Sequence, residues 1–453
     1  MPSFDQVFKA YDIRGLVPDQ LDAPMCRAIG GAFAAFALES DSAIDRILLA
    51  RDMRPSGVDL SHAFAEGAQA QGVDVTYLGL TSTDMLYYAS GKLHAPGAVF
   101  TASHNPAQYN GIKLCLAGAK PIGEESGLLR IKELAAGGQL REVDPHVRGR
   151  GTSLELLEDF AEHVRSFIDV RVLRPLKVVA DTANGMGGMV VPAVFRGLPV
   201  QLEVLFEELD GTFPNHPADP IQPENLKDLM ARVLDTGADI GLAFDGDADR
   251  VFLVDEQARP VSGSLTTALV ATSVLDKYPG STIIHNLICS KTVPETIREH
   301  GGTPIRTRVG HSFIKQVMAE TGAAFGGEHS GHYYFRENYR ADSGLIAALI
   351  VLEAMSRAGQ PLSELLRPLD RYAASGEINF RVTDAAVLIE HVSSVFEANE
   401  QDRLDGLTVD CGDWWFNLRP SNTEPLLRLN LEAANAESRD AHVAELRQLI
   451  NPS

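Results

Sequence analysis

Three segments of the chain share one pattern: a short apolar run, a polar turn and an amphipathic stretch with helical spacing. The apolar runs span residues 47–50, 177–180 and 282–284, and the helical stretches that follow cover 57–71, a segment ending at about 196, and 293–300. A strand followed by a helix is half of a βαβ unit. The pattern therefore predicts three α/β domains of similar construction.

A second apolar strand follows each of these units and ends in a polar loop. The strands are predicted at 98–100, 240–244 and 323–325, and their loops at 101–105, 245–250 and 327–332. Ligands of open α/β sheets bind at the carboxyl ends of the strands. We therefore expect each domain to give one loop to a shared site.

The pattern changes after about residue 369. Strand-like alternation at 377–382 is followed by a helical stretch at 385–399, two short strands within 407–418, another alternating strand at 426–431 and a helix at 437–450. This order has no repeated strand–helix unit, so it predicts a smaller α+β domain at the C-terminus. The domains are expected at 1–150, 151–256, 257–369 and 370–453.

Length and charge narrow the classes of function. The chain has 453 residues, too many for one hydrophobic core, and its contents of 45% hydrophobic and 22% charged residues are those of a globular protein. A formal net charge of −21 argues against a nucleic-acid partner, because phosphate backbones need clustered Lys and Arg. A small phosphorylated substrate stays compatible with this charge, since a local basic pocket dominates at contact distance.

The spacing of the cysteines and the length of the apolar stretches indicate the cellular compartment of the protein. No two of the four cysteines form a C-x-x-C pair; they are Cys26, Cys115, Cys289 and Cys411. This spacing favours reduced thiols over a zinc site or a disulfide framework. No signal peptide is visible, and the longest apolar stretch, 344–355, contains Glu353 and is too short to span a bilayer. We expect a cytoplasmic protein with no membrane partner.

Asp245, Asp247 and Asp249 occupy alternate positions in the loop after the strand at 240–244. Carboxylates that converge repel one another, and a divalent cation relieves that repulsion. Ligands that are all oxygen atoms favour Mg²⁺ over zinc. The loop therefore predicts a site for one Mg²⁺ ion, with a solvated acidic turn as the alternative.

A calcium-binding EF-hand loop is a second alternative for these aspartates. They match its first, third and fifth ligands, and Glu256 falls at the twelfth position. Arg250, however, stands where an EF-hand needs Gly, and the flanking segments are strand-like instead of helical. These two departures exclude the EF-hand.

The loop at 101–106 contains Ser103 and His104, and Lys113 follows a few residues later. A strand that ends in such a loop places a hydroxyl, an imidazole and an ammonium group at the rim of a sheet, where chemistry takes place in α/β folds. Ser, Asn and Pro are also ordinary turn residues. The loop alone therefore leaves a plain turn open, and the nearby segment 11–15 adds only Arg14.

Two further loops suit a sugar phosphate. Glu328 and Ser330 lie among glycines, which let backbone approach a ligand, and both side chains suit sugar hydroxyls. His311 lies at the start of a predicted helix, where free N–H groups can meet an anion. Arg419 and Arg428 flank hydroxyl and amide side chains, a combination that binds phosphate monoesters. Each loop taken alone is also compatible with an ordinary turn, and His311 with a helix cap or a buried His.

Together and in this order, five segments resemble the α-D-phosphohexomutase family, and within it the bacterial phosphomannomutase/phosphoglucomutase group. They are 11–15, 101–106, 245–250, 327–332 and 419–425. The resemblance extends over essentially the whole chain, and five motifs in one order are far more specific than any single one. It implies three similar α/β domains with mixed sheets and a smaller α+β domain around a central cleft.

The resemblance also implies roles for the matching positions. Ser103 is expected to carry a phosphoryl group and to hold Mg²⁺ through it, together with Asp245, Asp247 and Asp249. His104 is expected to support the serine loop, and Lys113 or His332 to move protons. The remaining catalytic residues implied near the transferred group are Arg14 and Arg250. The implied substrate contacts are Tyr11, His311, Glu328, Ser330, Arg419, Ser421, Asn422, Thr423 and Arg428.

The implied activity is the interconversion of hexose 1-phosphate and hexose 6-phosphate, with mannose and/or glucose as the sugar. A hexose 1,6-bisphosphate would form from the phosphoserine and turn over in the cleft. We expect a monomer or weak homo-oligomer. Phosphoglucosamine mutase, which uses the same chemistry on an amino sugar, is the nearest alternative. The sugar preference stays open, because His329 matches neither the Met of many dual-specificity members nor the Gln of glucosamine-specific ones. A non-catalytic sugar-phosphate-binding protein of the same fold is the other alternative.

Overall fold

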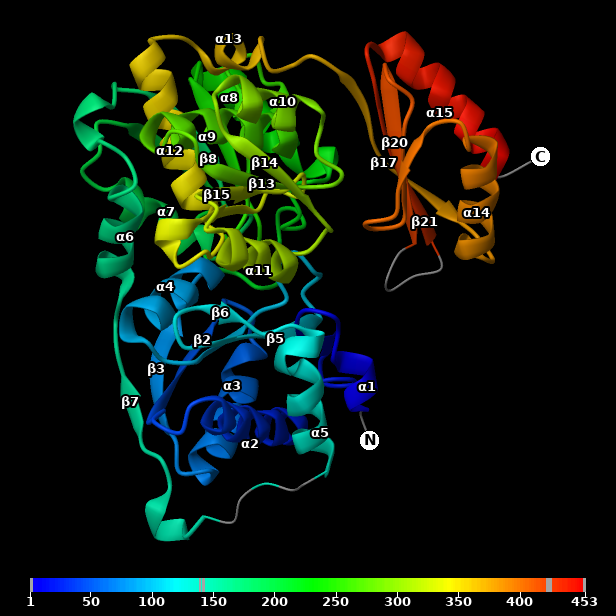
Figure 1. Cartoon of the computed structure of the whole chain (residues 1–453). Coiled ribbons are helices and arrows are strands. Elements are labelled where there is room, and N and C mark those ends of the chain that lie inside the picture. The colour runs from blue at the N-terminus through cyan, green and yellow to red at the C-terminus, as the bar shows by residue number, and fades with distance from the viewer. Residues whose placement is uncertain (1–2, 138–139, 141–142, 421–425, 451–453) are drawn as a thin grey trace.

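A computed structural model of the chain describes residues 3–137, 140, 143–420 and 426–450, with the backbone alone at 125, 145 and 311. Within these residues the chain forms four β-sheets. We call the parts built on them the first to fourth domains (Figure 1). The described part of the chain contains no helix that is both long and apolar enough to cross a membrane.

The first sheet has the strand order β1-β5-β4-β2-β3-β7, with β6 paired to β5. Its strands are β1 (Ile13–Leu16), β2 (Arg46–Arg51), β3 (Asp74–Leu80), β4 (Gly97–Phe100), β5 (Tyr109–Leu116), β6 (Lys120–Pro121) and β7 (Gly151–Ser153). The helices of this domain are α1 (Phe4–Val7), α2 (Ala23–Ser40), α3 (Gly57–Ala70), α4 (Thr83–Leu93) and α5 (Leu129–Gly137).

The second sheet has the order β12-β11-β10-β8-β9 and the third β14-β13-β15-β16. The second domain contains α6 (Leu157–Arg165), β8 (Lys177–Asp181), α7 (Gly187–Phe195), β9 (Gln201–Leu205), α8 (Lys227–Thr236), β10 (Ile240–Phe244), β11 (Val251–Asp255) and β12 (Pro260–Val261). The third contains α9 (Gly263–Lys277), β13 (Thr282–Asn286), α10 (Thr292–Glu299), β14 (Thr303–Thr307), α11 (His311–Thr321), β15 (Phe325–Gly327), β16 (Tyr333–Phe335), α12 (Gly344–Ala358) and α13 (Leu362–Leu366).

These three sheets repeat one arrangement of strands. The series β5-β4-β2-β3, β11-β10-β8-β9 and β16-β15-β13-β14 each begin with an antiparallel pair and continue with parallel pairs. In each domain the predicted functional loop joins the two strands of the antiparallel pair. The prediction of three similar α/β domains with mixed sheets is therefore confirmed, and the three loops occupy equivalent places.

The fourth domain is an antiparallel sheet covered by two helices. Its strand order is β17-β21-β20-β19-β18. The elements are β17 (Ala373–Arg381), α14 (Ala385–Val395), β18 (Glu400–Asp402), β19 (Leu407–Asp410), β20 (Trp414–Pro420), β21 (Leu426–Ala433) and α15 (Ala436–Ile450). Figure 1 shows this domain beside the third, reached by the chain that leaves α13. The predicted α+β class of the C-terminal part is confirmed.

Some predicted elements differ from those observed. The strand predicted at 323–325 begins at Phe325 and continues through Gly326 and Gly327, which pair with Tyr334 and Tyr333. The helix predicted at 385–399 ends at Val395, and the strand predicted at 377–382 already begins at Ala373. Strand pairing extends the first sheet to Ser153 and the second to Val261. The division at 150, 256 and 369 stays a proposal.

Buried side chains on both faces of the sheets explain why the central strands are apolar throughout. Ile47 and Leu49 of β2 pack in the cluster formed with α2 and α3, whereas Leu48 and Ala50 pack in a second cluster on the other face. Strands covered on both faces have continuous apolar runs instead of alternation. The second cluster is continuous from the first domain into the second and third, so these three domains share one core.

The fourth domain has a core of its own, separate from that of the other three. Its contacts with the third domain include polar ones: Lys291 Nζ lies 2.8 Å from Asp410 Oδ1, and the backbone N–H of Val309 donates to Asp405 Oδ2 at 3.3 Å. An apolar core inside one domain and polar contacts between domains are typical of parts that change their relative position.

Asp84, at the start of α4, lies where the first and third domains meet. Its carboxylate accepts hydrogen bonds from the hydroxyl of Ser82 and, at 2.7 Å, from that of Ser343, the residue that caps α12. The side chain is fully buried. Burial raises the pKa of Asp84 to about 8, because the charged form loses its hydration.

This shift predicts that the protein loses stability as pH rises from about 4 to about 8, because the folded state retains a proton that the unfolded chain has released. Asp84→Asn removes the ionisation and keeps the shape, so it should flatten the dependence of Tm on pH in this window. Thermal unfolding followed by circular dichroism tests this. The control is Asp169→Asn. The Arg171 hydrogen bond lowers the pKa of Asp169 to about 2, so the ionisation of this residue affects stability only at lower pH. An unchanged profile for Asp84→Asn would contradict the prediction.

Candidate active site

The loop between β4 and β5 brings Ser103 to the edge of the first sheet. Ser103 has φ of +48°, in the left-handed region that side chains with a Cβ avoid. Its backbone N–H donates to Thr101 Oγ1 at 2.9 Å. Such a conformation costs on the order of 1–3 kcal/mol and persists only where the surroundings enforce it, as happens at functional sites.

The hydroxyl of Ser103 meets the acidic loop of the second domain. It donates to Asp245 Oδ2 at 2.8 Å and accepts from Arg250 Nη2 at 2.9 Å. The residue is only 4% exposed. The structure therefore joins the predicted serine loop and the predicted metal loop through the serine oxygen itself.

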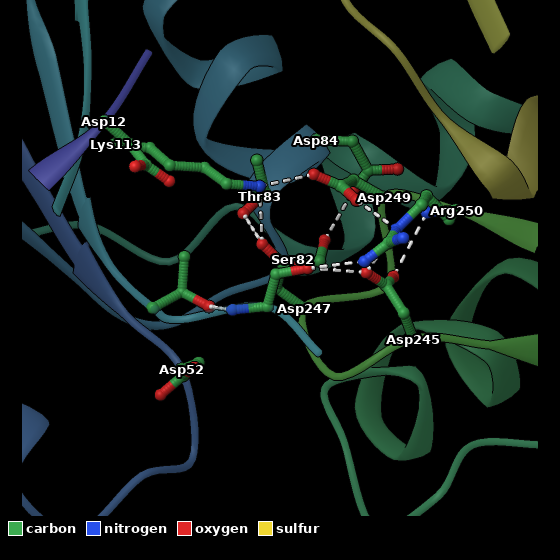
Figure 2. A network of polar contacts seen from close by, with 12 residues as sticks. Asp12, Asp52, Ser82, Thr83, Asp84, Lys113, Asp245, Asp247, Asp249 and Arg250 are labelled. Carbon is green, nitrogen blue, oxygen red and sulfur yellow. Dashed lines mark hydrogen bonds and ion pairs between the residues drawn. The ribbon is translucent and has the colours of Figure 1, made fainter. Parts of the chain in front are cut away.

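The three aspartates of the acidic loop converge as predicted. Each offers a carboxylate oxygen within 4.8 Å of the others, and all three residues are buried. Lys113 Nζ donates to Asp247 Oδ2 at 2.8 Å and to Asp249 Oδ2 at 2.6 Å, while Arg250 Nε donates to Asp245 Oδ2 at 2.8 Å. Figure 2 shows Lys113 and Arg250 reaching the carboxylates from opposite sides.

The charged groups in this cluster shift one another's pKa values. Burial lowers the pKa of Lys113, but the attraction of Asp247 and Asp249 outweighs burial and raises it well above its usual range. The same ammonium group, with a hydrogen bond from Thr83, holds the pKa of Asp247 below its usual value despite burial. Burial raises the pKa of Asp245 to about 7 although Arg250 opposes it. The cations thus balance the acidic cluster only in part.

The donor set fits a hard divalent cation. Among the described residues, Asp247 Oδ1 and Asp249 Oδ1 are buried oxygen atoms without a hydrogen-bond partner. Carboxylate oxygens alone favour Mg²⁺ over softer metals. Gly246 keeps the loop in place, because a Cβ there would come within 2.4 Å of the carbonyl oxygen of Ser103.

His104 and Arg14 support the serine loop. His104 Nδ1 accepts a hydrogen bond from Arg250. Burial, with the nearby charges of Arg250 and Arg14, lowers the pKa of His104 well below its usual range, so the ring is neutral. Arg14 donates to the side chains of Asn105 and Asp12.

His332 reaches the acidic cluster from the third domain. Its Nδ1 lies 2.8 Å from Asp342 Oδ2 and 3.9 Å from Asp249 Oδ1. Burial lowers the pKa of His332, but the hydrogen bond to Asp342 and the charge of Asp249 outweigh it and raise the pKa. Lys315 Nζ in turn lies 2.8 Å from Asp342 Oδ1.

Glu328 is buried among hydrogen-bond donors at the end of β15. It accepts from the hydroxyl of Tyr334 at 2.5 Å, from Asn286 Nδ2 at 3.2 Å and from the backbone N–H of Gly310 at 3.4 Å. Ser330 is half-buried in the same loop.

Tyr11 joins the first domain to the third. Its hydroxyl donates to the carbonyl of Val309 at 3.5 Å, and its ring packs edge-on against Phe313. Since Gly310 also donates to Glu328, the predicted substrate residues Tyr11 and Glu328 flank the start of α11.

In the fourth domain, Arg419 and Arg428 converge on Glu377. Arg419 Nη2 donates to Glu377 Oε2 at 2.8 Å, and Arg428 Nε lies 3.5 Å from Glu377 Oε1. These two arginines are partners across β20 and β21. The other predicted residues of this loop, Ser421, Asn422 and Thr423, and the side chain of His311 lie outside the part that the structure describes.

Thr83 and Arg54 are among the residues of the site that were not predicted from the sequence. The Thr83 hydroxyl donates to Asp247 Oδ2 at 2.6 Å, and Arg54 donates to several carbonyl oxygens of the serine loop. Both follow strands that end at the same edge of the first sheet as β4. That position was the one available signal, because ligand sites gather at the carboxyl ends of parallel strands.

Comparisons with known proteins cover nearly the whole chain. Four family models match in succession: phosphoglucomutase/phosphomannomutase alpha/beta/alpha domain I at residues 5–140, domain II at 158–259, domain III at 262–372 and the C-terminal domain at 377–449.

Individual proteins of related names also match over nearly the whole chain. A phosphomannomutase of Salmonella montevideo is 39% identical over 98% of each chain, and a phosphohexose mutase of Xanthomonas campestris is 38% identical over 97% of this chain and 98% of its own. The structure of a phosphoglucomutase/phosphomannomutase family protein from Burkholderia thailandensis superimposes with a TM-score of 0.90 at 33% identity, covering 99% of this chain and 97% of that one. The chain belongs to the phosphoglucomutase/phosphomannomutase family.

Proposed function

We propose that this protein is a Mg²⁺-dependent phosphohexomutase that interconverts hexose 1-phosphate and hexose 6-phosphate, with mannose and/or glucose as the sugar. The observation that carries the proposal is the placement of the Ser103 hydroxyl between Asp245 and Arg250. A serine oxygen held beside a carboxylate cluster and a guanidinium suits a group that receives and donates a phosphoryl group.

Asp245, Asp247 and Asp249 are the residues that would hold Mg²⁺, with a phosphate on Ser103 as a further ligand. The ion would supply neutralisation of the charge on the transferred phosphoryl group. Arg250 and Lys113 already bring positive charge to that place, through contacts of 2.6–2.9 Å with the serine oxygen and the carboxylates. Phosphoryl transfer depends mainly on such positioning and charge.

Lys113 and His332 are the residues we assign to proton movement. Both lie against the acidic cluster, and Asp342 orients the imidazole of His332. Arg14 donates to Asn105 of the serine loop, and His104 in that loop accepts a hydrogen bond from Arg250 of the second domain. These roles account for the catalytic residues predicted from the sequence.

Substrate binding is assigned to the third and fourth domains, together with Tyr11 of the first. Glu328 and Ser330, with Tyr11, would contact the sugar, and Arg419 and Arg428 would bind the phosphate that does not react. The predicted contacts outside the described part keep the same assignment: His311, Ser421, Asn422 and Thr423. Glu377 holds both arginines and would have to share them with that phosphate.

The substrate exchanges its two ends during the reaction. The phosphoserine would give its phosphoryl group to one end of the sugar, forming a hexose 1,6-bisphosphate, and recover a phosphoryl group from the other after the intermediate turns over. One set of arginines then serves both orientations. A monomer or weak homo-oligomer and a cytoplasmic location remain predictions.

Ser103→Ala should lower kcat by about 10⁴-fold or more, because it removes the oxygen that carries the phosphoryl group. Activity with glucose 1-phosphate and glucose 1,6-bisphosphate measures this, and mass spectrometry should find phosphate on Ser103 of the wild type alone. The matched control is Ser166→Ala, an exposed serine that bonds only its own helix and should keep full activity. Wild-type activity in Ser103→Ala would refute the mechanism.

Removal of the metal by EDTA should abolish turnover, and Mg²⁺ should restore it. Asp249→Asn should raise the Mg²⁺ concentration required for half-maximal activity at least about tenfold, since a carboxylate ligand is lost. The exposed Asp413→Asn serves as a control and should match the wild type. Activity that is indifferent to EDTA would contradict the assignment of the metal.

A panel of mannose, glucose and glucosamine 1-phosphates decides the sugar. We expect kcat/KM to be larger for mannose or glucose than for glucosamine, in line with the family motifs. The largest kcat/KM on glucosamine 1-phosphate would identify a phosphoglucosamine mutase instead. Binding of all three without turnover by the Mg²⁺-loaded, phosphorylated protein would identify a non-catalytic binding protein.

A further inference from the structure

Arg54 lies beneath the loop that carries Ser103. It follows β2, which pairs in parallel with β4, and its side chain is fully buried. The guanidinium donates to three backbone carbonyl oxygens of that loop, to that of the first residue of β5 and to one carboxylate: Ser103 O (2.9 Å), Asn105 O (2.7 Å), Pro106 O (2.8 Å), Tyr109 O (3.0 Å) and Asp52 Oδ2 (3.2 Å). These contacts use the full set of N–H donors of a guanidinium.

The contact with the carbonyl of Ser103 explains how the residue keeps its left-handed conformation. Arg54 holds the carbonyl oxygen, Thr101 holds the N–H, and Gly246 packs against the same carbonyl from the second domain. With its N–H and carbonyl groups held in this way, Ser103 places its hydroxyl between Asp245 and Arg250, with His104 Nδ1 3.2 Å from the same oxygen.

The second domain closes over Arg54. The ring centroid of Phe213 lies 5.1 Å from the guanidinium carbon of Arg54, and a Cβ at Gly211 would come within 2.6 Å of the Arg54 Cα. Arg54 is therefore enclosed between the serine loop and the second domain. Its hydrogen bonds end on backbone oxygens and on Asp52, and none of them reaches the serine hydroxyl.

We propose that Arg54 is a positioning residue for phosphoryl transfer, which holds the serine oxygen in line with the phosphoryl group by fixing the carbonyls of the loop. This inference rests on the proposed function of the site. Transfer rates fall steeply when the reacting atoms are displaced, by about 100-fold for a shift of about 1 Å. A lysine cannot replace the arginine, because its ammonium group is a point charge that cannot span four carbonyl oxygens.

The test is Arg54→Lys, with Arg165→Lys as the matched control. Arg165 also donates to two backbone carbonyls, those of Ala193 and Val194, but on α7, outside the site. We expect Arg54→Lys to lower kcat per folded molecule about 100-fold with glucose 1-phosphate while KM changes little. The rate at which glucose 1,6-bisphosphate phosphorylates Ser103, followed by mass spectrometry, should fall by the same factor. Arg165→Lys should match the wild type in both.

A merely structural role for Arg54 predicts a different result. It would lower Tm or the folded fraction and leave both rates per folded molecule unchanged, and that outcome overturns the inference. If Arg54→Lys does not fold, Asp52→Asn takes its place, because it keeps the shape but removes the charge, and its one amide oxygen can accept from only one of the two Arg54 groups that the carboxylate binds, the backbone N–H and Nε. A kcat equal to that of the wild type in a folded Asp52→Asn would then refute the inference, and a selective loss of kcat supports it.

The wild type measured in parallel separates the two proposals. A phosphorylated, Mg²⁺-loaded wild type without mutase activity overturns the proposed function, and with it the role of Arg54. An active wild type together with a fully active Arg54→Lys overturns the role of Arg54 alone.

Discussion

Three buried carboxylates in one loop repel one another. The contact between the first two domains depends on the cations that offset this repulsion. Lys113 belongs to the first domain, whereas its partners Asp247 and Asp249 belong to the second. Arg250 balances Asp245 from within the loop and also reaches back to Ser103. Charge compensation therefore holds the serine oxygen and the three aspartates together, and such preorganisation suits the phosphoryl transfer that we propose.

The same balance leaves one oxygen atom of Asp247 and one of Asp249 for the cation that we propose. Lys113 occupies Oδ2 of both Asp247 and Asp249, and the remaining Oδ1 atoms are buried without hydrogen bonds within the described part of the chain. Arg14 and Arg54 contact the serine loop instead of these three carboxylates. On the proposed assignment, one set of residues balances charge, and another sets the position of the serine oxygen.

Much of this arrangement could be predicted from the sequence, because strands buried on both faces leave long apolar runs and end in polar loops. The spacing of Asp245, Asp247 and Asp249 indicated the metal site in the same direct way. The extent of β15 could not be predicted, since Gly326 and Gly327 are poor strand formers. A Cβ at Gly326 would come within 2.9 Å of Ile314, and a Cβ at Gly327 within 2.4 Å of Thr267. Close packing therefore overrides the low strand propensity of glycine here.

Arg54 was missed for a different reason. Its partners are backbone carbonyls 49 to 55 residues away, and a carbonyl leaves no trace in the identity of the residue that bears it. Side chains that contact side chains produce recognisable pairs of charges, as in the acidic loop. A buried arginine that binds backbone can be found only once the fold has placed the two strands β2 and β4 side by side.

The effect of His329 on sugar specificity likewise could not be predicted before the fold was known. It stands between Glu328 and Ser330 in the sequence, yet its imidazole lies 3.5 Å from the hydroxyl of Ser264 at the start of α9. It lines a cavity of about 260 Å³ between the third and fourth domains, together with Tyr372 and Asn430. A substitution at this position therefore changes the support of the Glu328 loop and the junction with the fourth domain. On the proposed assignment, residue 329 would affect sugar preference through the way these two parts position Glu328 and the arginines of the fourth domain.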